Sequence, residues 1–299
     1  MTEASSFADD RALAIVNPVA GKGAGERLAK RMAADFRAQG VRVDIVRTPA
    51  PDEAARLARE AAADGYRFIV SVGGDGTANE IANGIVGSGA VLALYPIGSG
   101  NDFARALGYP RRPRDVVGFL RSARRRSIDV GEMNGRIFVN AAGVGIDGHV
   151  AARVTATSRI VGETLGYFTG ALVGIATYRP RPMRVLIDGE LISGRFLSVV
   201  AANGTHFGSG MRIAPQASLD DGQLDVVLAG DLSPWASMVA LGKIYFGTHI
   251  DGKTIILKRA RAVEIELERP LAAQLDGEVT TVPHLSIRVR PRALEVLAR

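Results

Sequence analysis

The first 130 residues alternate two hydrophobic patterns: short continuous apolar runs, and longer segments in which apolar residues recur every three or four positions. The short runs predict buried strands and the longer segments predict amphipathic helices. Strand–helix pairs in this order predict a parallel sheet flanked by helices. The expected strands are RALAIVN (11–17), VRVDIVRT (41–48), FIVSVGG (68–74) and VLALYPIG (91–98).

The pattern changes near residue 131 to short alternating runs bounded by glycines or charged turns. Such runs predict a mostly antiparallel β-sandwich, with helices near 154–177 and 234–246. We therefore expect two domains, an α/β domain at 11–130 and a β-sandwich at 131–299, after a disordered start at 1–10. The sequence leaves open whether the C-terminal strands return to the first domain.

Composition narrows the chemistry. The chain has no cysteine, which excludes disulfides, cysteine-ligated metals and thiol catalysis. The formal net charge is +6, and residues 111–126 hold seven arginines and one acid. This arginine cluster is either a solvated face or a surface for anionic partners. A single aromatic residue, Phe119, lies within it, and this scarcity of aromatic residues argues against a nucleic-acid partner. The start is not a secretory signal, and no apolar stretch is long enough to span a membrane, so we expect a cytoplasmic protein.

The segment VSVGGDGTANEI (70–81) joins an expected strand to an expected helix. Gly73, Gly74 and Gly76 let backbone N–H groups approach a ligand. A helix start after such a turn favours an anion such as phosphate. Thr77 and Glu80 have the spacing of a capping box. Asp75 repels bare phosphate, so it fits better beside a Mg²⁺ ion or a ribose hydroxyl. The alternative is a plain strand–helix turn with a capping acid.

Two further glycine-rich turns follow the first and fourth expected strands, namely NPVAGKG (17–23) and PIGSGN (96–101). The first lacks the spacing of a P-loop, and Lys22 is as consistent with a solvated loop as with a phosphate contact. Ser99 or Asn101 can cap the next helix. Because parallel strands end at a common edge, we expect the three turns to lie side by side there, where open α/β sheets bind ligands.

At these residues the chain resembles the diacylglycerol kinase catalytic-domain family, and in particular its bacterial soluble lipid kinases. The resemblance rests on NPVAG (17–21), GGDGTANE (73–80), PIGSGNDFARALG (96–108), NAAGVGID (140–147), APQASLDDGQLDV (214–226) and LDGE (275–278). It implies an NAD kinase/diacylglycerol kinase-like two-domain fold that binds ATP. The residues it implies for ATP are Asn17, Pro18, Val19, Ala20, Gly21, Thr48, Gly73, Gly74, Asp75, Gly76, Thr77, Ala78, Asn79 and Ser99.

The resemblance also implies how phosphate is transferred. Glu278 would be the general base, with Asp75 close to a catalytic Mg²⁺. A second, structural Mg²⁺ would be held by Ser218, Asp221 and Gln223. The DGE sequence occurs twice, and Glu190 in IDGE is expected to be an ordinary surface acid. The stretch 161–178 is either a core helix or the lining of an acyl pocket.

The resulting hypothesis is an ATP-dependent kinase of a membrane lipid alcohol such as diacylglycerol. It would associate peripherally with an anionic membrane through the arginine cluster; a homodimer is left open. The alternatives are a soluble-metabolite kinase related to NAD kinases and a non-catalytic regulator that binds nucleotide or lipid. The TANE and PIGSGNDFA segments favour the lipid branch, and the intact GGDGT and LDGE segments favour an enzyme.

Overall fold

The computed structural model describes residues 11–23, 25–150, 173–175 and 177–299. These residues divide into two compact units. The first runs to Val130 and takes in Pro291–Arg299, and the second is Gly131–Arg290. The expected disordered start and most of the expected helix at 154–177 lie outside the described residues.

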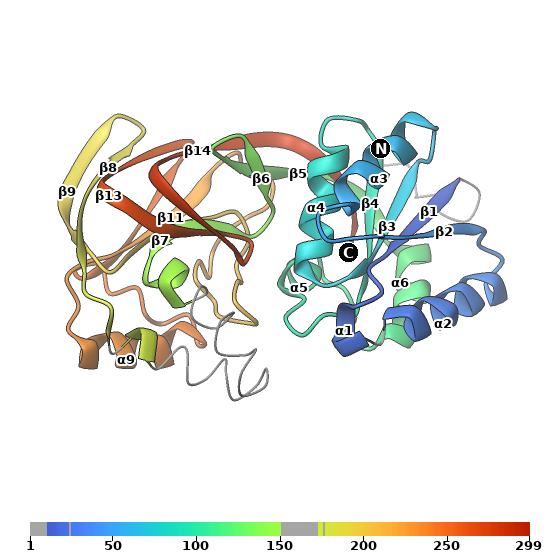
Figure 1. Cartoon of the computed structure of the whole chain (residues 1–299), viewed down its shortest axis with the longest axis horizontal. Coiled ribbons are helices and arrows are strands. Elements are labelled where there is room, and N and C mark those ends of the chain that lie inside the picture. The colour runs from blue at the N-terminus through green and yellow to red at the C-terminus, as the bar shows by residue number, and fades with distance from the viewer. Residues whose placement is uncertain (1–10, 24, 151–172, 176) are drawn as a thin grey trace. The chain divides into compact units, whose positions relative to one another are not determined.

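The first unit is built on a parallel sheet with the strand order β4-β3-β1-β2. Helices α3 and α4 lie on one face of this sheet and α2 and α6 on the other (Figure 1). The strands are β1 (Ala12–Val16), β2 (Val43–Arg47), β3 (Phe68–Gly73) and β4 (Val91–Pro96). The helices are α1 (Ala20–Gly23), α2 (Gly25–Ala38), α3 (Ala54–Ala63), α4 (Asp75–Ile85), α5 (Asp102–Ala106), η1 (Pro113–Asp115) and α6 (Val116–Ser122).

The sequence pattern explains this layering. Every residue of β3 is buried, as expected for a central strand covered on both faces. Helix α2 buries Ala29, Met32 and Phe36, which repeat at helical spacing. Gly84 allows helix α3 to pack closely on α4. A Cβ at this position would lie only 2.3 Å from the Ala55 carbonyl oxygen. The expected α/β architecture is confirmed.

The end of the chain belongs to the first unit. Glu295 and Val296 pair in parallel with Val91 and Leu92 of β4. The Glu295 carboxylate accepts a hydrogen bond from Arg125 Nε at 2.7 Å. The last strand is thereby tied into the parallel sheet.

The second unit is a mostly antiparallel β-sandwich, which also confirms the expectation. Its strand order is β12-β11-β10-β7-β13-β14, and the β8–β9 hairpin pairs with β13. The strands are β5 (Arg124–Met133), β6 (Arg136–Phe138), β7 (Ala141–Gly145), β8 (Arg181–Ile187), β9 (Glu190–Phe196), β10 (Ser198–Ala202), β11 (Leu224–Ala229), β12 (Ile255–Ala260), β13 (Ala262–Leu275) and β14 (Glu278–Ala298).

Strand β13 serves both layers of the sandwich. Its first part pairs with β8, its last part pairs with β7, and the register shifts between Glu266 and Leu271. Side chains from both layers, including Phe138, Val185 and Val226, form the main buried cluster. A second cluster on another face of the sheet packs against helix α9 (Pro234–Ile244), the helix expected near 234–246.

Candidate functional site

The three glycine-rich turns of the first unit meet at one edge of its sheet, as expected. A Cβ on Gly98 would lie 2.6 Å from the Gly74 Cα, and a Cβ on Gly21 would lie 2.8 Å from the Ile97 carbonyl oxygen. Gly21 also has φ +60°. Glycine is therefore needed at Gly21 and Gly98 because the backbones of neighbouring turns approach so closely.

The Asn17 side chain joins the first two turns and also braces its own turn. Asn17 Nδ2 donates to Thr77 Oγ1 at 3.2 Å, and Asn17 Oδ1 accepts from the Val19 N–H at 3.1 Å. The Thr48 N–H donates to the Val16 carbonyl at 2.9 Å, so Thr48 lies at the same edge, beside the start of the first turn.

The expected ATP residues divide by exposure. Val19 and Ser99 are exposed at this edge, whereas Thr77, Ala78 and Asn79 are buried in α4. The Asn79 carbonyl and its side-chain oxygen accept hydrogen bonds from Asn83 Nδ2. The three buried residues therefore support the turn from within the unit and offer little surface to a ligand.

Asp75 begins α4 and lies against the start of α5. Its Oδ1 accepts a hydrogen bond from the Phe103 N–H at 3.0 Å. Burial raises the pKa of Asp75, backbone hydrogen bonds from Phe103 and Asp102 oppose that rise, and the negative charge of Asp102 adds to it. Asp102 is itself buried and pairs with Arg105 at 2.5 Å. Arg105 thus supplies one positive charge beside Asp102, and a further cation would stabilise the charged form of the neighbouring Asp75.

The capping expectations for these turns are wrong. Helix α4 begins at Asp75, two residues before Thr77, and its N-cap Gly74 makes no side-chain cap bond. Glu80 Oε2 instead accepts a hydrogen bond from the Ala54 N–H at the start of α3. Asn101 makes no side-chain cap to α5, because its amide group bonds both the N–H and the carbonyl of Gly98.

Glu278 follows the tight turn between β13 and β14 in the second unit. Its Oε2 accepts a hydrogen bond from Arg136 Nη2 at 2.6 Å, and its side chain is 35% exposed. Asp276 holds the turn in place, because its carboxylate accepts from the backbone N–H groups of Val139, Asn140 and Ala141 at 2.7–2.9 Å. The turn thus positions a partly exposed, ion-paired carboxylate.

The expected structural metal ligands lie before β11. The Asp221 carboxylate accepts from the Gln223 N–H at 3.1 Å, and Ser218 Oγ donates to Asp220. Burial raises the pKa of Asp225, Arg259 lowers it, and the charge of Asp221 raises it. Among the described residues, Asp225 Oδ2 is buried without a hydrogen-bond partner. A cation bound by Asp221 would suit this arrangement.

No group of three or more His, Cys, Asp or Glu side chains suited to a metal ion occurs within the described ranges. The expected ligand set does not require such a group, because Ser218 and Gln223 would contribute backbone carbonyls.

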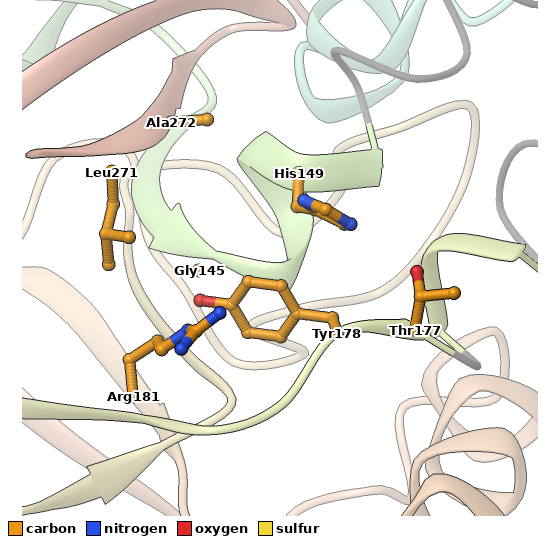
Figure 2. Close-up of a pocket in the computed structure, with 7 residues that line it drawn as sticks. All are labelled: Gly145, His149, Thr177, Tyr178, Arg181, Leu271 and Ala272. Carbon is orange, nitrogen blue, oxygen red and sulfur yellow. The ribbon is translucent and has the colours of Figure 1, made fainter.

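A small pocket of about 110 Å³ lies in the second unit. The side chains of His149, Tyr178 and Arg181 line it (Figure 2). Within the described part of the chain, four buried polar atoms in this region have no hydrogen-bond partner, namely Asp147 Oδ2, Tyr178 OH, Arg181 Nε and Gln274 Nε2. The pocket can therefore accept a polar group. Of the stretch 161–178, only 173–175, 177 and 178 are described, and Thr177 and Tyr178 line this polar pocket.

Asp147 lies between Gly145 and His149 of this pocket, and its Oδ2 atom is buried although the residue as a whole is partly exposed. Burial raises its pKa to about 6, against hydrogen bonds that lower it, the largest from Ser198 Oγ at 2.8 Å. Burial also raises the pKa of Tyr178 to about 12, and the negative charge of Asp147 adds to that rise.

Comparison with known proteins assigns the chain to a family. The diacylglycerol kinase catalytic domain matches residues 11–133, and the YegS C-terminal NAD kinase beta sandwich-like domain matches residues 140–298. A Pseudomonas aeruginosa protein named probable lipid kinase YegS-like is 33% identical over 278 residues, covering 92% of this chain and 91% of that protein. The chain belongs to the YegS-like diacylglycerol kinase family.

Other relatives agree with this family. The diacylglycerol kinase of Bacillus subtilis strain 168 is 28% identical over 273 residues, covering 90% of this chain and 89% of that protein. A crystal structure from Bacillus anthracis strain Sterne, assigned to the diacylglycerol kinases, superposes with a TM-score of 0.81 at 25% identity. It covers 97% of this chain and 98% of that one. The predicted family, and with it the prediction of a lipid kinase enzyme, is confirmed.

The arginine cluster lies just before and on η1, on α6 and at the start of β5. Arg111, Arg112, Arg114, Arg121 and Arg124 are exposed, whereas Arg125 is partly buried and pairs with Glu295. None of the helices in the described ranges is long and apolar enough to cross a membrane.

The sequence reasoning missed three acids that the structure makes prominent: Asp102, Asp147 and Asp225. Each lies within a motif that carried the resemblance, yet each reads locally as an ordinary polar residue beside a turn. One sequence feature could have identified Asp147 and Asp225: each acid lies in or beside an apolar strand. Burial in such a place raises the pKa of a carboxyl.

Proposed function

We propose that this protein transfers the γ-phosphate of ATP to a hydroxyl of a membrane lipid such as diacylglycerol. The observation that carries the proposal is the meeting of three glycine-rich turns at one sheet edge. Backbone N–H groups at a strand–helix junction suit the phosphates of a nucleotide. The YegS-like and diacylglycerol kinase relatives supply the lipid acceptor class.

The first-unit edge binds the nucleotide in this proposal. Gly73, Gly74 and Gly76 approach the phosphates through their backbone. Asn17 and Thr48 lie along the same edge, and Ser99 offers an exposed hydroxyl beside Gly98. Serine keeps the hydroxyl contact where the family more often has threonine.

Phosphoryl transfer needs positioning and charge neutralisation more than covalent chemistry. Asp75 and Asp102 would hold a catalytic Mg²⁺, which would offset charge on the transferred group. Asp221, with the carbonyls of Ser218 and Gln223, would hold a structural Mg²⁺. Burial is the main cause of the raised pKa of Asp75 and of Asp225, and the negative charge of a second acid adds to it at each. A cation bound nearby would offset the cost of these charges.

Glu278 accepts the proton of the attacking lipid hydroxyl. Asp276 anchors its turn, and Arg136 keeps the carboxylate ion-paired before substrate binds. The exposed arginines at 111–126 attract an anionic membrane, each contributing about 1 kcal/mol close to the surface.

The test is a transfer assay with labelled ATP, Mg²⁺ and two acceptor panels, one of lipid alcohols in mixed micelles and one of soluble metabolites including NAD. The proposal predicts labelled lipid and no labelled metabolite. Labelling of a soluble acceptor alone would favour the NAD kinase-like alternative. Tight ATP binding without transfer to either panel would favour a non-catalytic regulator.

A further inference from the structure

Helix α9 and the turn after it expose large apolar side chains to solvent. Trp235 is 78% exposed and Phe246 is 76% exposed, and Met238, Val239 and Tyr245 are exposed as well. Trp235, Met238 and Val239 share one side of helix α9 (Pro234–Ile244) at helical spacing, and Phe246 lies in the turn that follows the helix. We call Trp235, Met238, Val239, Tyr245 and Phe246 the α9 face. A contiguous exposed apolar surface marks contact with a partner or a membrane.

The inner side of the same helix carries smaller groups. Ser237 is buried, and Ala240 and Ile244 pack against a cluster that includes Val227 and Ile255. A helix of a soluble protein ordinarily turns its largest apolar residues inward and its polar residues outward. Helix α9 reverses this arrangement, so its outer face is suited to contact with an apolar surface.

Local interactions fix both ends of this surface. Ser233 Oγ accepts a hydrogen bond from the Ala236 N–H at 3.3 Å, and Pro234 occupies the first helical turn. At the other end Gly247 has φ +68°, and the Thr248 N–H donates to the Lys243 carbonyl. The 11-residue helix is about 17 Å long. It is too short to span a bilayer and suits a position in the interfacial plane.

The charges beside the α9 face are positive. Lys243 and Arg212 are exposed, and the Arg212 N–H donates to the Ile244 carbonyl at 3.0 Å. The sequence contains no acid between residues 232 and 250. The acids at either end are engaged: Asp231 pairs with Arg195 at 3.2 Å, and Asp251 accepts from backbone N–H groups of residues 253–255.

We propose that the α9 face is the surface through which the second unit docks on a bilayer that contains anionic lipid. Aromatic side chains flanked by cations are typical of residues at the membrane–water interface. This inference rests on the proposed function, because the acceptor of a lipid kinase resides in the bilayer. A second copy is a poorer occupant, because a two-fold contact would bring the Lys243 and Arg212 cations of both copies into one interface.

Trp235 is the only tryptophan in the chain, so its fluorescence reports on this surface alone. The experiment adds phosphatidylcholine vesicles with increasing phosphatidylglycerol to the full-length protein. The inference predicts emission at shorter wavelength, quenching by brominated acyl chains, and a response that grows with anionic lipid and weakens with salt. An emission maximum that vesicles leave unchanged overturns it. A shift that depends on protein concentration without vesicles also overturns it, because a second copy then covers the face.

A matched pair of variants locates the contact. Phe246→Ser removes an exposed apolar side chain and keeps the fluorescent probe, so vesicle affinity should fall at least about tenfold. Leu191→Ser removes a side chain that is 51% exposed on β9, and affinity should stay at the parent value. Circular dichroism melting should be unchanged for both variants, since both side chains are exposed. Equal loss of affinity in the two variants overturns the inference.

Turnover of a short-chain, water-soluble diacylglycerol separates this inference from the proposed function. Phe246→Ser should keep parent turnover on that acceptor and lose turnover on vesicle-bound diacylglycerol. Parent protein that docks through Trp235 but phosphorylates no acceptor contradicts the proposed function and leaves the docking surface standing. If the parent protein phosphorylates the short-chain acceptor but vesicles leave Trp235 emission unchanged, the docking surface is contradicted and the proposed function stands.

Discussion

Asp276 and Asp188 occupy equivalent positions in two hairpins with the same Asp-Gly-Glu sequence. Both have positive φ, +46° and +45°, and both are followed by a glycine with positive φ, as two-residue hairpin turns require. Their surroundings differ. Asp276 is partly buried and bonds three backbone N–H groups at the start of β7, whereas Asp188 is exposed and bonds those of Arg261 and Ala262. The same local sequence thus anchors very different amounts of structure.

Asp276→Asn should lower the free energy of unfolding by about 2 kcal/mol. The substituted amide keeps one acceptor but turns a donor toward the Val139 N–H, which then lacks its partner. Asparagine retains the turn preference, so the backbone is not strained. Asp188→Asn is the control and should cost less than about 1 kcal/mol, because water replaces a lost bond at an exposed site. Urea denaturation measures both values, and equal losses would contradict the anchoring role of Asp276.

Asp147 makes stability depend on pH in a defined direction. Its folded pKa of about 6 lies above the ordinary value of roughly 4. Stability is therefore full below pH 4 and falls as the pH rises toward 6, because the unfolded chain releases its proton first. The difference corresponds to roughly 3 kcal/mol at most.

Asp147→Asn should remove this decline. The stability of the variant relative to the parent should rise between pH 4 and pH 7, measured by urea denaturation at each pH. Asp251 is the control of opposite sign, since backbone hydrogen bonds from Ile255 and Lys253 lower its pKa. Asp251→Asn should lose stability relative to the parent as the pH rises from 3 to 5. A pH-independent difference for Asp147→Asn would contradict its burial as an acid with a raised pKa.

At the scale of elements, the glycines of the first unit fall into two kinds. Gly73 and Gly98 are required by packing, because added Cβ atoms would lie 2.4 Å from Thr77 Oγ1 and 2.6 Å from the Gly74 Cα. Gly76 has open space around its Cβ position, yet it lies in the first turn of α4, where glycine weakens a helix. Packing therefore gives no reason for glycine at position 76, whereas the proposed nucleotide binding would give one.

Gly76→Ala should leave the free energy of unfolding unchanged or raise it by up to about 1 kcal/mol, while ATP affinity falls at least about tenfold. Gly98→Ala should lower both the free energy of unfolding and the ATP affinity, because the turns that contain Gly74 and Gly98 must separate to fit the added Cβ. Calorimetric titration with a non-hydrolysable ATP analogue and urea denaturation give the two quantities. Parent-like nucleotide affinity in Gly76→Ala would show that this glycine does not lie against the phosphates.

The hydrophobic pattern predicted the elements well and their terminal interactions badly. Buried positions are apolar, so apolar runs such as FIVSVGG and the helical spacing of Ala29, Met32 and Phe36 predict the elements directly. Thr77 and Glu80 have capping-box spacing, but Glu80 bonds the start of α3. That partner lies 26 residues away in the sequence and becomes a neighbour only when α3 packs on α4. The Asn101 cap was also wrong, but there the competing partner is local, because its amide group bonds Gly98 three residues earlier.

At the scale of the whole molecule, two units with separate cores share two long strands. β5 and β14 each contribute residues to both units. The alternation in LSIRVRPRALEVLA predicts a strand but not its neighbour, so the sequence alone left the destination of the C-terminus open. In the structure, the Arg292 N–H donates to the buried Asp129 carboxylate at 2.8 Å, and Glu295 pairs with Arg125. These two acids hold the end of the chain in the first unit.

Candidate functional residues occur in both units. Asp75 and the glycine turns belong to the first unit, and Glu278 belongs to the second. Family resemblance, and not local pattern, singled out Glu278, since Glu190 has the same Asp-Gly-Glu context and likewise forms an ion pair, with Lys258 at 2.5 Å. The two glutamates therefore form a natural matched pair for testing catalysis.

The most direct test of the account is the turnover number for lipid phosphorylation in Glu278→Gln and Glu190→Gln, measured with labelled ATP under saturating acceptor. Loss of a general base predicts that Glu278→Gln falls by about 10²- to 10⁴-fold, with ATP affinity and melting temperature unchanged. Glu190→Gln should stay within about twofold of the parent. A Glu278→Gln variant that phosphorylates lipid as fast as the parent would contradict the assignment of Glu278 as the base.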